Sequence, residues 1–235
     1  MPEAEQPQSL EYHLNELRTR FFHSAIVFAG LTAFGFYFSG DIMSFLQADL
    51  NIQLNTFKAY EAFYTQLMIS ILFGFLTGLP VFLYQLLKFA QPGLEPKEYL
   101  IVRNFLPFSY ILFIAGFLFS YEFVVKTSLN FFKNFTSDAG VKSVWGLRTT
   151  IGFALKLSAA NGILFQLPVI SLILGKAGII SADKMKTYRF HVVIAVLMIA
   201  AIATPPDIVT QILITLPVIG LYQLSIYLVK RTEPV

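Results

Sequence analysis

The chain has 235 residues, 56 % of them hydrophobic and 13 % charged, against about 25 % charged residues in an average soluble domain. This composition excludes an ordinary soluble fold and predicts an all-α integral membrane protein, because lipid is the solvent that tolerates so much apolar surface. The absence of cysteine excludes disulfides and thiolate chemistry. A net charge of +3 without a clustered basic face gives no reason to expect nucleic acid as a partner.

The N-terminal 20 residues are polar or amphipathic. Residues 1–8 are polar and proline-bearing, and we predict that they are disordered. Over residues 9–20, Leu10, Leu14 and Leu17 recur at helical spacing, which predicts an amphipathic helix lying at the membrane surface. The acidic residues here differ from the basic start of a secretory signal, so we expect this segment to be retained.

Six apolar runs follow, and together they predict one transmembrane domain over residues 21–229. The runs cover about residues 21–38, 63–87, 105–125, 150–174, 192–203 and 208–229. The last two spans are predicted to be short. The fifth, with about 12 residues, reaches only about 18 Å across a hydrocarbon core of about 30 Å. The hairpin of Pro205, Pro206 and Asp207 should therefore lie below the membrane surface, covered by protein.

Lysine and arginine predict the orientation of these spans. The side that holds both termini and the loops near residues 88–103 and 175–190 carries eleven of them, and the other side carries five. By the positive-inside rule, both termini should be cytoplasmic.

Three polar residues fall within the predicted spans. Glu122 and Lys156 should both lie near the outer side, either as a mutual ion pair or as the lining of a polar cavity. Gln166, beside Pro168, either bonds across helices or serves a groove. Small residues recur at every fourth position in several spans, which predicts close packing of helices. These stripes are Ala25, Ala29 and Ala33, then Gly74 and Gly78, and then Ala154, Ser158 and Gly162.

Two glutamates at the predicted inner face have local explanations. Glu16 is placed to pair with Arg20 one turn later. Glu98 is placed to cap a helix that has Glu95 at its N-cap and Pro96 at its first position. Phosphate-binding loops, zinc-protease motifs and nucleophile elbows are absent, and His13, His23 and His191 show no metal-ligand spacing. We therefore expect neither enzymatic activity nor a cofactor.

Four short motifs stand in order along the chain. The first is His13-Leu14-Asn15-Glu16-Leu17-Arg18. The others are Leu79-Pro80-Val81 with Tyr84-Gln85 and the loop from Phe89 to Glu98, then Phe165-Gln166-Leu167-Pro168-Val169, and finally Thr204-Pro205-Pro206-Asp207 with Gln211 and Pro217. Together these motifs resemble the TatC family, the core receptor of the twin-arginine protein translocase, whose HLxELR signature the first motif matches. The resemblance spans nearly the whole chain.

This resemblance implies a fold and a function. The fold is a six-span bundle bent around a groove, in the cytoplasmic membrane of a bacterium or archaeon. The implied function is to bind twin-arginine signal peptides of folded cargo at the cytoplasmic face, and to pass the cargo across by using the proton gradient. The implied binding residues are Glu16, Arg18, Phe89, Leu94 and Glu98. The implied partners are single-span subunits of the TatA/TatB type, with further copies of the chain in the complex.

The sequence departs from the family pattern at three places. Gln166 stands where many members carry glutamate, so we expect a polar, hydrogen-bonding role there and not one that needs a charge. Asp49 and Lys126 stand where, or near where, members often carry proline. Two rival functions remain. A small-solute transporter or channel predicts several charges along a path, and an intramembrane enzyme predicts a nucleophile with a base at membrane depth.

Overall fold

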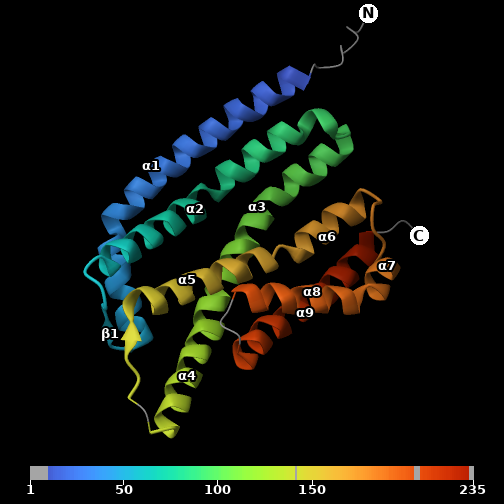
Figure 1. The fold of residues 1–235 in the computed structure, drawn as a ribbon. Helices are drawn as coiled ribbons and strands as arrows, with labels where there is room; N and C mark the ends of the chain where they lie inside the picture. The colour runs from blue at the N-terminus through green and yellow to red at the C-terminus, as the bar shows by residue number, and fades with distance from the viewer. Residues whose placement is uncertain (1–9, 141, 204–206, 233–235) are drawn as a thin grey trace, which may run out of the picture.

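The first two helices form a long antiparallel pair (Figure 1). The computed structural model describes residues 10–140, 142–203 and 207–232. Helix α1 (Leu10–Leu50) is one unbroken helix of 41 residues, and α2 (Glu61–Ala90) returns beside it. The predicted surface helix over residues 9–20 is thus not a separate element but the first turns of α1. No glycine or proline lies between Leu10 and Gly30 to interrupt it.

Glycines on α2 allow the two helices of this pair to approach closely. A Cβ at Gly74 would collide with the backbone of Thr32, and one at Gly78 would lie 3.3 Å from Leu31. The α2 stripe therefore packs as predicted. The corresponding α1 stripe was wrongly predicted, because Ala29 and Ala33 are exposed and α1 meets α2 through neighbouring positions.

The third helical stretch is 43 residues long and crosses the molecule from one end to the other (Figure 1). After the 3-10 turn η1 (Gln91–Gly93), it runs without a gap through α3 (Pro96–Phe119), the π-helical turn η2 (Ser120–Val125) and α4 (Lys126–Asp138). At 1.5 Å per residue it is about 65 Å long, which exceeds the full thickness of a bilayer.

The C-terminal half consists of shorter helices. Helices α5 (Leu147–Leu164) and α6 (Leu167–Lys176) are separated by a turn at Phe165 and Gln166, where Pro168 removes a backbone donor and starts the next helix. They are followed by α7 (Ala182–Thr187), α8 (Arg189–Ala203) and α9 (Ile208–Thr232). Pro205 and Pro206 lie outside the described residues.

Five helical stretches in the described part of the chain are long and apolar enough to cross a membrane. The fifth predicted span corresponds to α8, which has 15 residues, or about 22 Å, and is short as predicted. The prediction that the last span is also short was wrong. Helix α9 has 25 residues, because the helix does not end with the apolar run at Val229 but continues through Lys230 and Arg231.

A small sheet joins the two loops at the end of the molecule opposite η1 (Figure 1). Strands β1 (Leu54–Asn55) and β2 (Trp145–Gly146) pair in parallel, with Leu54 opposite Trp145. The prediction of an all-α fold omitted this pair, which is too short to show a strand pattern in the sequence.

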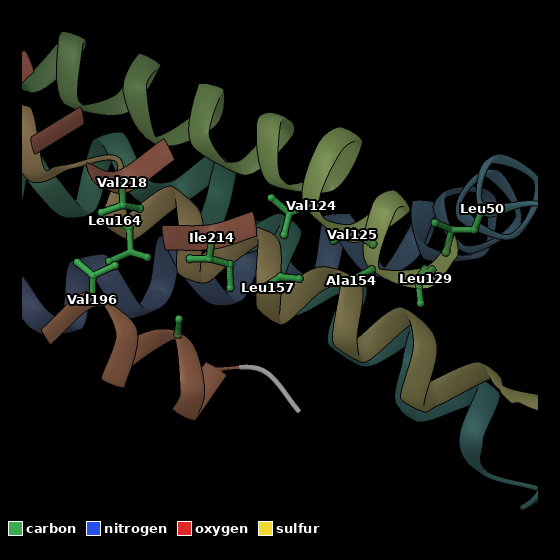
Figure 2. Close-up of a cluster of buried hydrophobic side chains, with 11 residues drawn as sticks. Leu50, Val124, Val125, Leu129, Ala154, Leu157, Leu164, Val196, Ile214 and Val218 are labelled. Atoms are coloured by element: carbon green, nitrogen blue, oxygen red, sulfur yellow. The ribbon is translucent and has the colours of Figure 1, made fainter. Parts of the chain in front are cut away.

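The main apolar cluster lies where α5 meets η2, α8 and α9 (Figure 2). Leu157 of α5 is fully buried there, with Val124 and Val125 of η2 and Ile214 and Val218 of α9 around it. Burying each such side chain contributes about 1.5–3 kcal/mol in water, whereas between helices in lipid close packing is the main contribution. This cluster makes α5 the central helix of the fold.

Candidate functional site

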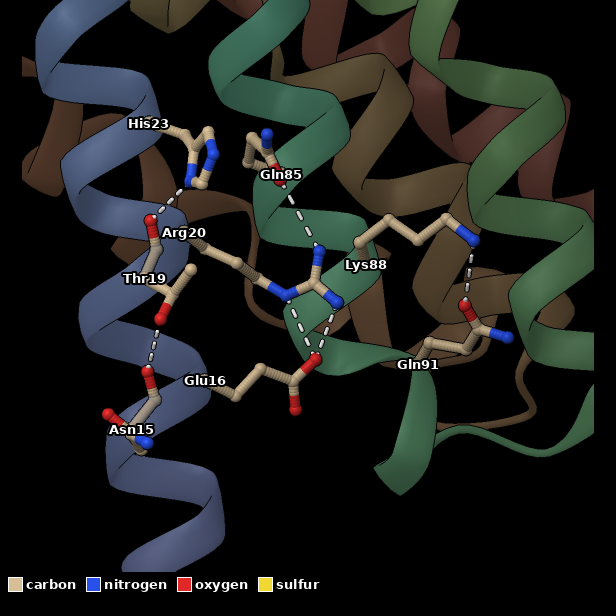
Figure 3. A network of polar contacts seen from close by, with 8 residues as sticks. All are labelled: Asn15, Glu16, Thr19, Arg20, His23, Gln85, Lys88 and Gln91. Atoms are coloured by element: carbon tan, nitrogen blue, oxygen red, sulfur yellow. Dashed lines mark hydrogen bonds and ion pairs between the residues drawn. The ribbon is translucent and has the colours of Figure 1, made fainter.

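An acidic and a basic side chain meet near the N-terminal end of α1 (Figure 3). Glu16 Oε1 accepts hydrogen bonds from Arg20 Nε at 2.9 Å and from Arg20 Nη2 at 2.5 Å. Arg20 Nη1 also donates to Gln85 Oε1 of α2 at 3.3 Å. The predicted local pair between Glu16 and Arg20 is therefore confirmed, and it is also part of a bridge between α1 and α2.

Glu16 faces a cavity of about 660 Å³, which we call the end cavity. Its lining comes from α1, α2, η1 and α3, and consists of Glu16, Arg20, Lys88, Gln91, Pro92, Leu94, Pro96, Tyr99 and Leu100. The side chain of Glu16 is 17 % exposed, so it is accessible from this cavity without being freely solvated.

Glu98 lies at the same end of the molecule, in the first turn of α3. Its Oε2 accepts a hydrogen bond from the Glu95 N–H at 2.9 Å, and the Glu95 side chain accepts one from the Glu98 N–H in return. The predicted capping box, with Pro96 at the first helical position, is confirmed. Glu98 does not line the end cavity, but Pro96 and Tyr99, on either side of it in sequence, do.

The other three predicted residues of this group divide between the cavity and its surroundings. Leu94 lines the end cavity. Phe89, in the last turns of α2, is half-buried and outside the cavity lining. Arg18 points elsewhere: its guanidinium carbon lies 5.7 Å from the ring centre of Phe22, and the residue is exposed.

Leu94 also lines a second cavity of about 540 Å³, which we call the apolar cavity. This cavity lies between α2, α3, α5 and α6, and every lining residue except Ser109 and Gln166 is apolar. The two cavities therefore meet at the loop between α2 and α3, with polar groups in one and an apolar wall in the other.

Gln166 holds the break between α5 and α6 against α3. Its Oε1 accepts a hydrogen bond from Ser109 Oγ, and its Nε2 donates to the carbonyls of Ser109 at 3.2 Å and Gly162 at 3.4 Å. Of the two predicted alternatives, the structure shows the bonds across helices. Gln166 also lines the apolar cavity, and its role in a groove stays a prediction.

The predicted ion pair between Glu122 and Lys156 was wrong. Glu122 pairs with Lys126, one turn later in the same helical stretch, at 2.7 Å. A pair one turn apart forms more easily than a pair across helices, because the backbone already places side chains i and i+4 next to each other. Lys156 is exposed on α5 and forms no ion pair within the described residues. Neither residue lines either cavity.

Asp207 and Gln211, the described part of the predicted hairpin site, fix the start of α9. Asp207 Oδ1 accepts a hydrogen bond from the Thr210 N–H at 2.7 Å, which is an N-cap contact. Gln211 Nε2 donates to the Leu197 carbonyl of α8 at 3.1 Å. The Asp207 contact caps α9, and the Gln211 contact ties α9 to α8.

Sequence reasoning gave no role to several residues that the structure places in these cavities. Lys88 and Tyr99 of the end cavity and Ser109 of the apolar cavity were not singled out. Gln85, which lines neither cavity but accepts a hydrogen bond from Arg20, was noted only as part of a motif. A signal was available for Lys88 and Tyr99, because both flank the short loop that carries Leu94. Nothing in the sequence pairs Ser109 with Gln166, since 57 positions separate them.

The comparisons with known proteins agree with this geometry. The family model for the Sec-independent protein translocase protein (TatC) matches residues 12–217. The TatC protein of Listeria innocua serovar 6a is 34 % identical over 226 residues, which cover 95 % of this chain and 92 % of that protein. The chloroplastic TATC of Arabidopsis thaliana is 38 % identical over 224 residues, which cover 94 % of this chain and 66 % of that protein.

A solved structure extends the likeness to three dimensions. The crystal structure of the twin-arginine translocase receptor TatC has a TM-score of 0.79 against this chain at 32 % sequence identity, and the match covers 94 % of this chain and 99 % of that one. The resemblance inferred from the four motifs is thus confirmed by sequence and by fold. The chain is a multi-span membrane protein that belongs to the TatC family of Sec-independent protein translocase proteins.

Proposed function

We propose that this chain is the receptor and core subunit of a twin-arginine translocase, and that it binds the paired arginines of a signal peptide at the α2–α3 loop. One observation carries the proposal. Glu16 lines the end cavity together with Pro96 and Tyr99, the neighbours of Glu98, so two carboxylates from distant parts of the chain lie at one end of the molecule.

The chemistry of these groups suits a guanidinium ligand. A carboxylate can accept two parallel N–H donors from the planar guanidinium fork, which lysine does not present. Each charge-assisted hydrogen bond contributes about 1.5–3 kcal/mol, so two such contacts with an adjacent apolar segment give micromolar binding.

The apolar cavity offers a place for the apolar segment of the same signal. Leu94 lines both cavities, so a peptide whose arginines lie in the end cavity can continue along α2 and α3. This lining favours a peptide over the rival ligand, a hydrated small solute. Apart from Ser109 and Gln166, the cavity presents only apolar side chains.

The remaining parts of the proposal follow the family. Six spans, with α8 as the shortest, place both termini in the cytoplasm of a bacterial or archaeal cell, as the lysine and arginine distribution indicates. The proton gradient drives transport. Single-span TatA/TatB-type subunits and further copies of the chain pack against the lipid-facing helices, of which α1 is the most exposed.

A fluorescence anisotropy assay on the detergent-solubilised chain tests the binding. A labelled twin-arginine signal peptide should bind, and the same peptide with both arginines replaced by lysine should bind at least tenfold more weakly, a difference of about 1.4 kcal/mol. Equal affinity for the two peptides would refute the proposed function while leaving the fold unaffected.

A further inference from the structure

The carboxylate that we assign to the signal already holds a guanidinium. Both hydrogen bonds from Arg20 go to the same oxygen, Glu16 Oε1, and the third contact of Arg20 reaches Gln85 on the neighbouring helix (Figure 3). Arg20 thus presents to Glu16 the same chemical group that a signal arginine would present.

The net charge of the end cavity also bears on how a signal arginine can bind. Its lining contains one carboxylate, Glu16, and two cations, Arg20 and Lys88. A peptide that brings two further guanidinium groups would meet a lining that is positive overall. Glu16 becomes an attractive partner only when Arg20 no longer neutralises it.

We propose that Arg20 is an internal competitor, which occupies the arginine subsite of Glu16 until a signal peptide displaces it. This inference rests on the proposed function, since it assigns Glu16 to the signal. It makes Arg20 a specificity-determining residue. A ligand must offer a guanidinium fork at least as well placed as that of Arg20, and a lysine ammonium does not.

The geometry allows the exchange. Arg20 and Glu16 are one turn apart on α1, and their side chains are 26 % and 17 % exposed, so water can replace the broken contact. Gln85 remains as an acceptor for Arg20 after displacement, which keeps the released guanidinium near α2. Sharing is less favourable than exchange, because two guanidinium groups on one carboxylate repel each other at contact distance.

The geometry of the pair is also compatible with an alternative role for Arg20, which is to orient Glu16. The two roles predict opposite changes in signal-peptide affinity when Arg20 is removed. If Arg20 orients Glu16 for the signal, its removal weakens binding. If Arg20 competes with the signal, its removal tightens binding. The affinity of an Arg20 variant for the signal peptide therefore distinguishes them.

The experiment measures labelled twin-arginine peptide binding to the full-length chain in detergent. Arg20→Gln should bind about three- to tenfold more tightly than the wild type, since the lost competitor is a partly exposed pair of modest strength. Lys97→Gln is the matched control: it removes one positive charge from the exposed start of α3 without contacting Glu16, and its affinity should stay within about twofold of the wild type. In a Glu16→Gln background, Arg20→Gln should have no further effect.

Three results overturn the inference. These are weaker or unchanged binding by Arg20→Gln, an equal gain from Lys97→Gln, or a gain that persists without the Glu16 carboxylate. Thermal unfolding of each variant checks folding. Arg20→Lys, which keeps the charge but loses the fork, provides a second test with an expected gain smaller than that of Arg20→Gln. The proposed function fails on a separate result, which is equal affinity of the wild-type chain for the twin-lysine and twin-arginine peptides.

Discussion

Asp49, at the end of α1, and Lys126, at the start of α4, form an ion pair of 3.1 Å across 77 positions of the chain. The Tyr121 hydroxyl donates to the same carboxylate at 2.6 Å, and Lys126 also pairs with Glu122. Asp49 stands where, and Lys126 near where, members of the family often carry proline. The structure shows that the two residues are partners, which join the far end of α1 to the long third stretch.

Asp49→Asn and Lys126→Gln should therefore show coupled effects on stability. Their side chains are 29 % and 25 % exposed, so we expect a coupling free energy of about 0.5–1 kcal/mol that falls as salt is added. A double-mutant cycle on thermal unfolding in detergent measures it. The pair of Asp183 and Lys186 is the control: Asp183 is 89 % exposed, and its cycle should show no measurable coupling. Additive effects at Asp49 and Lys126 would show that the contact contributes nothing.

Gly74→Ala should separate α1 from α2. The new Cβ would lie 2.9 Å from the Thr32 nitrogen and 3.0 Å from its Cα, and backbone cannot rotate away as a side chain can. Overpacking of this kind costs about 1–3 kcal/mol. Gly30→Ala is the matched control, since nothing lies within 4 Å of its Cβ position, and it should be neutral or slightly stabilising. Thermal unfolding of both variants measures the difference in stability. An equal loss of stability in both would contradict the close contact between Gly74 and Thr32.

Glu98 forms the capping box of α3, and we propose that it also binds the signal, so two substitutions are needed to separate the observed role from the proposed one. Glu98→Gln keeps an acceptor for the Glu95 N–H, so stability should be unchanged. Glu98→Ala removes that acceptor and should cost about 0.5–1.5 kcal/mol of unfolding free energy. Both lose the charge and should bind twin-arginine peptide about tenfold more weakly. If Glu98→Gln bound the twin-arginine peptide with wild-type affinity, capping would be the only role left for Glu98.

Gln166→Leu should loosen the contact between α3 and the α5–α6 break. It removes three hydrogen bonds at a half-buried position, and we expect a loss of about 1–2 kcal/mol in unfolding free energy. Ser109→Ala removes only the hydroxyl contact and should cost less. The double variant should be less destabilised than the sum of the two, because both remove the same bond. A strictly additive result would argue against the Gln166–Ser109 bond.

The sequence predicted the parts of the fold that depend on local pattern. Hydrophobic runs located the long apolar helices, and Glu95, Pro96 and Glu98 identified the capping box of α3. The shortness of α8 followed from the position of Pro205 and Pro206 in the sequence. These features depend on neighbours in the chain, which is the information that a single sequence carries.

Apart from the length of α9, the errors concern contacts between distant residues. Glu122 and Lys156 were paired because both seemed to need a partner in lipid, but Lys126 offers Glu122 a nearer one. The bridge from Arg20 to Gln85, over 65 positions, also had no signal in the sequence. The Ala29 and Ala33 stripe failed for a related reason, since small residues do not by themselves tell which helix face meets a neighbour.

The run from Pro96 to Asp138 makes the third stretch a single long rod. Glu98 stands in its first turn and Asp138 at its far end. If the stretch tilts as a rigid body by about ten degrees, one tip shifts against the other by about 11 Å. The π-helical turn at Ser120–Val125 changes the backbone hydrogen-bond pattern near the middle of the rod, so it is the place where a bend would reduce that shift.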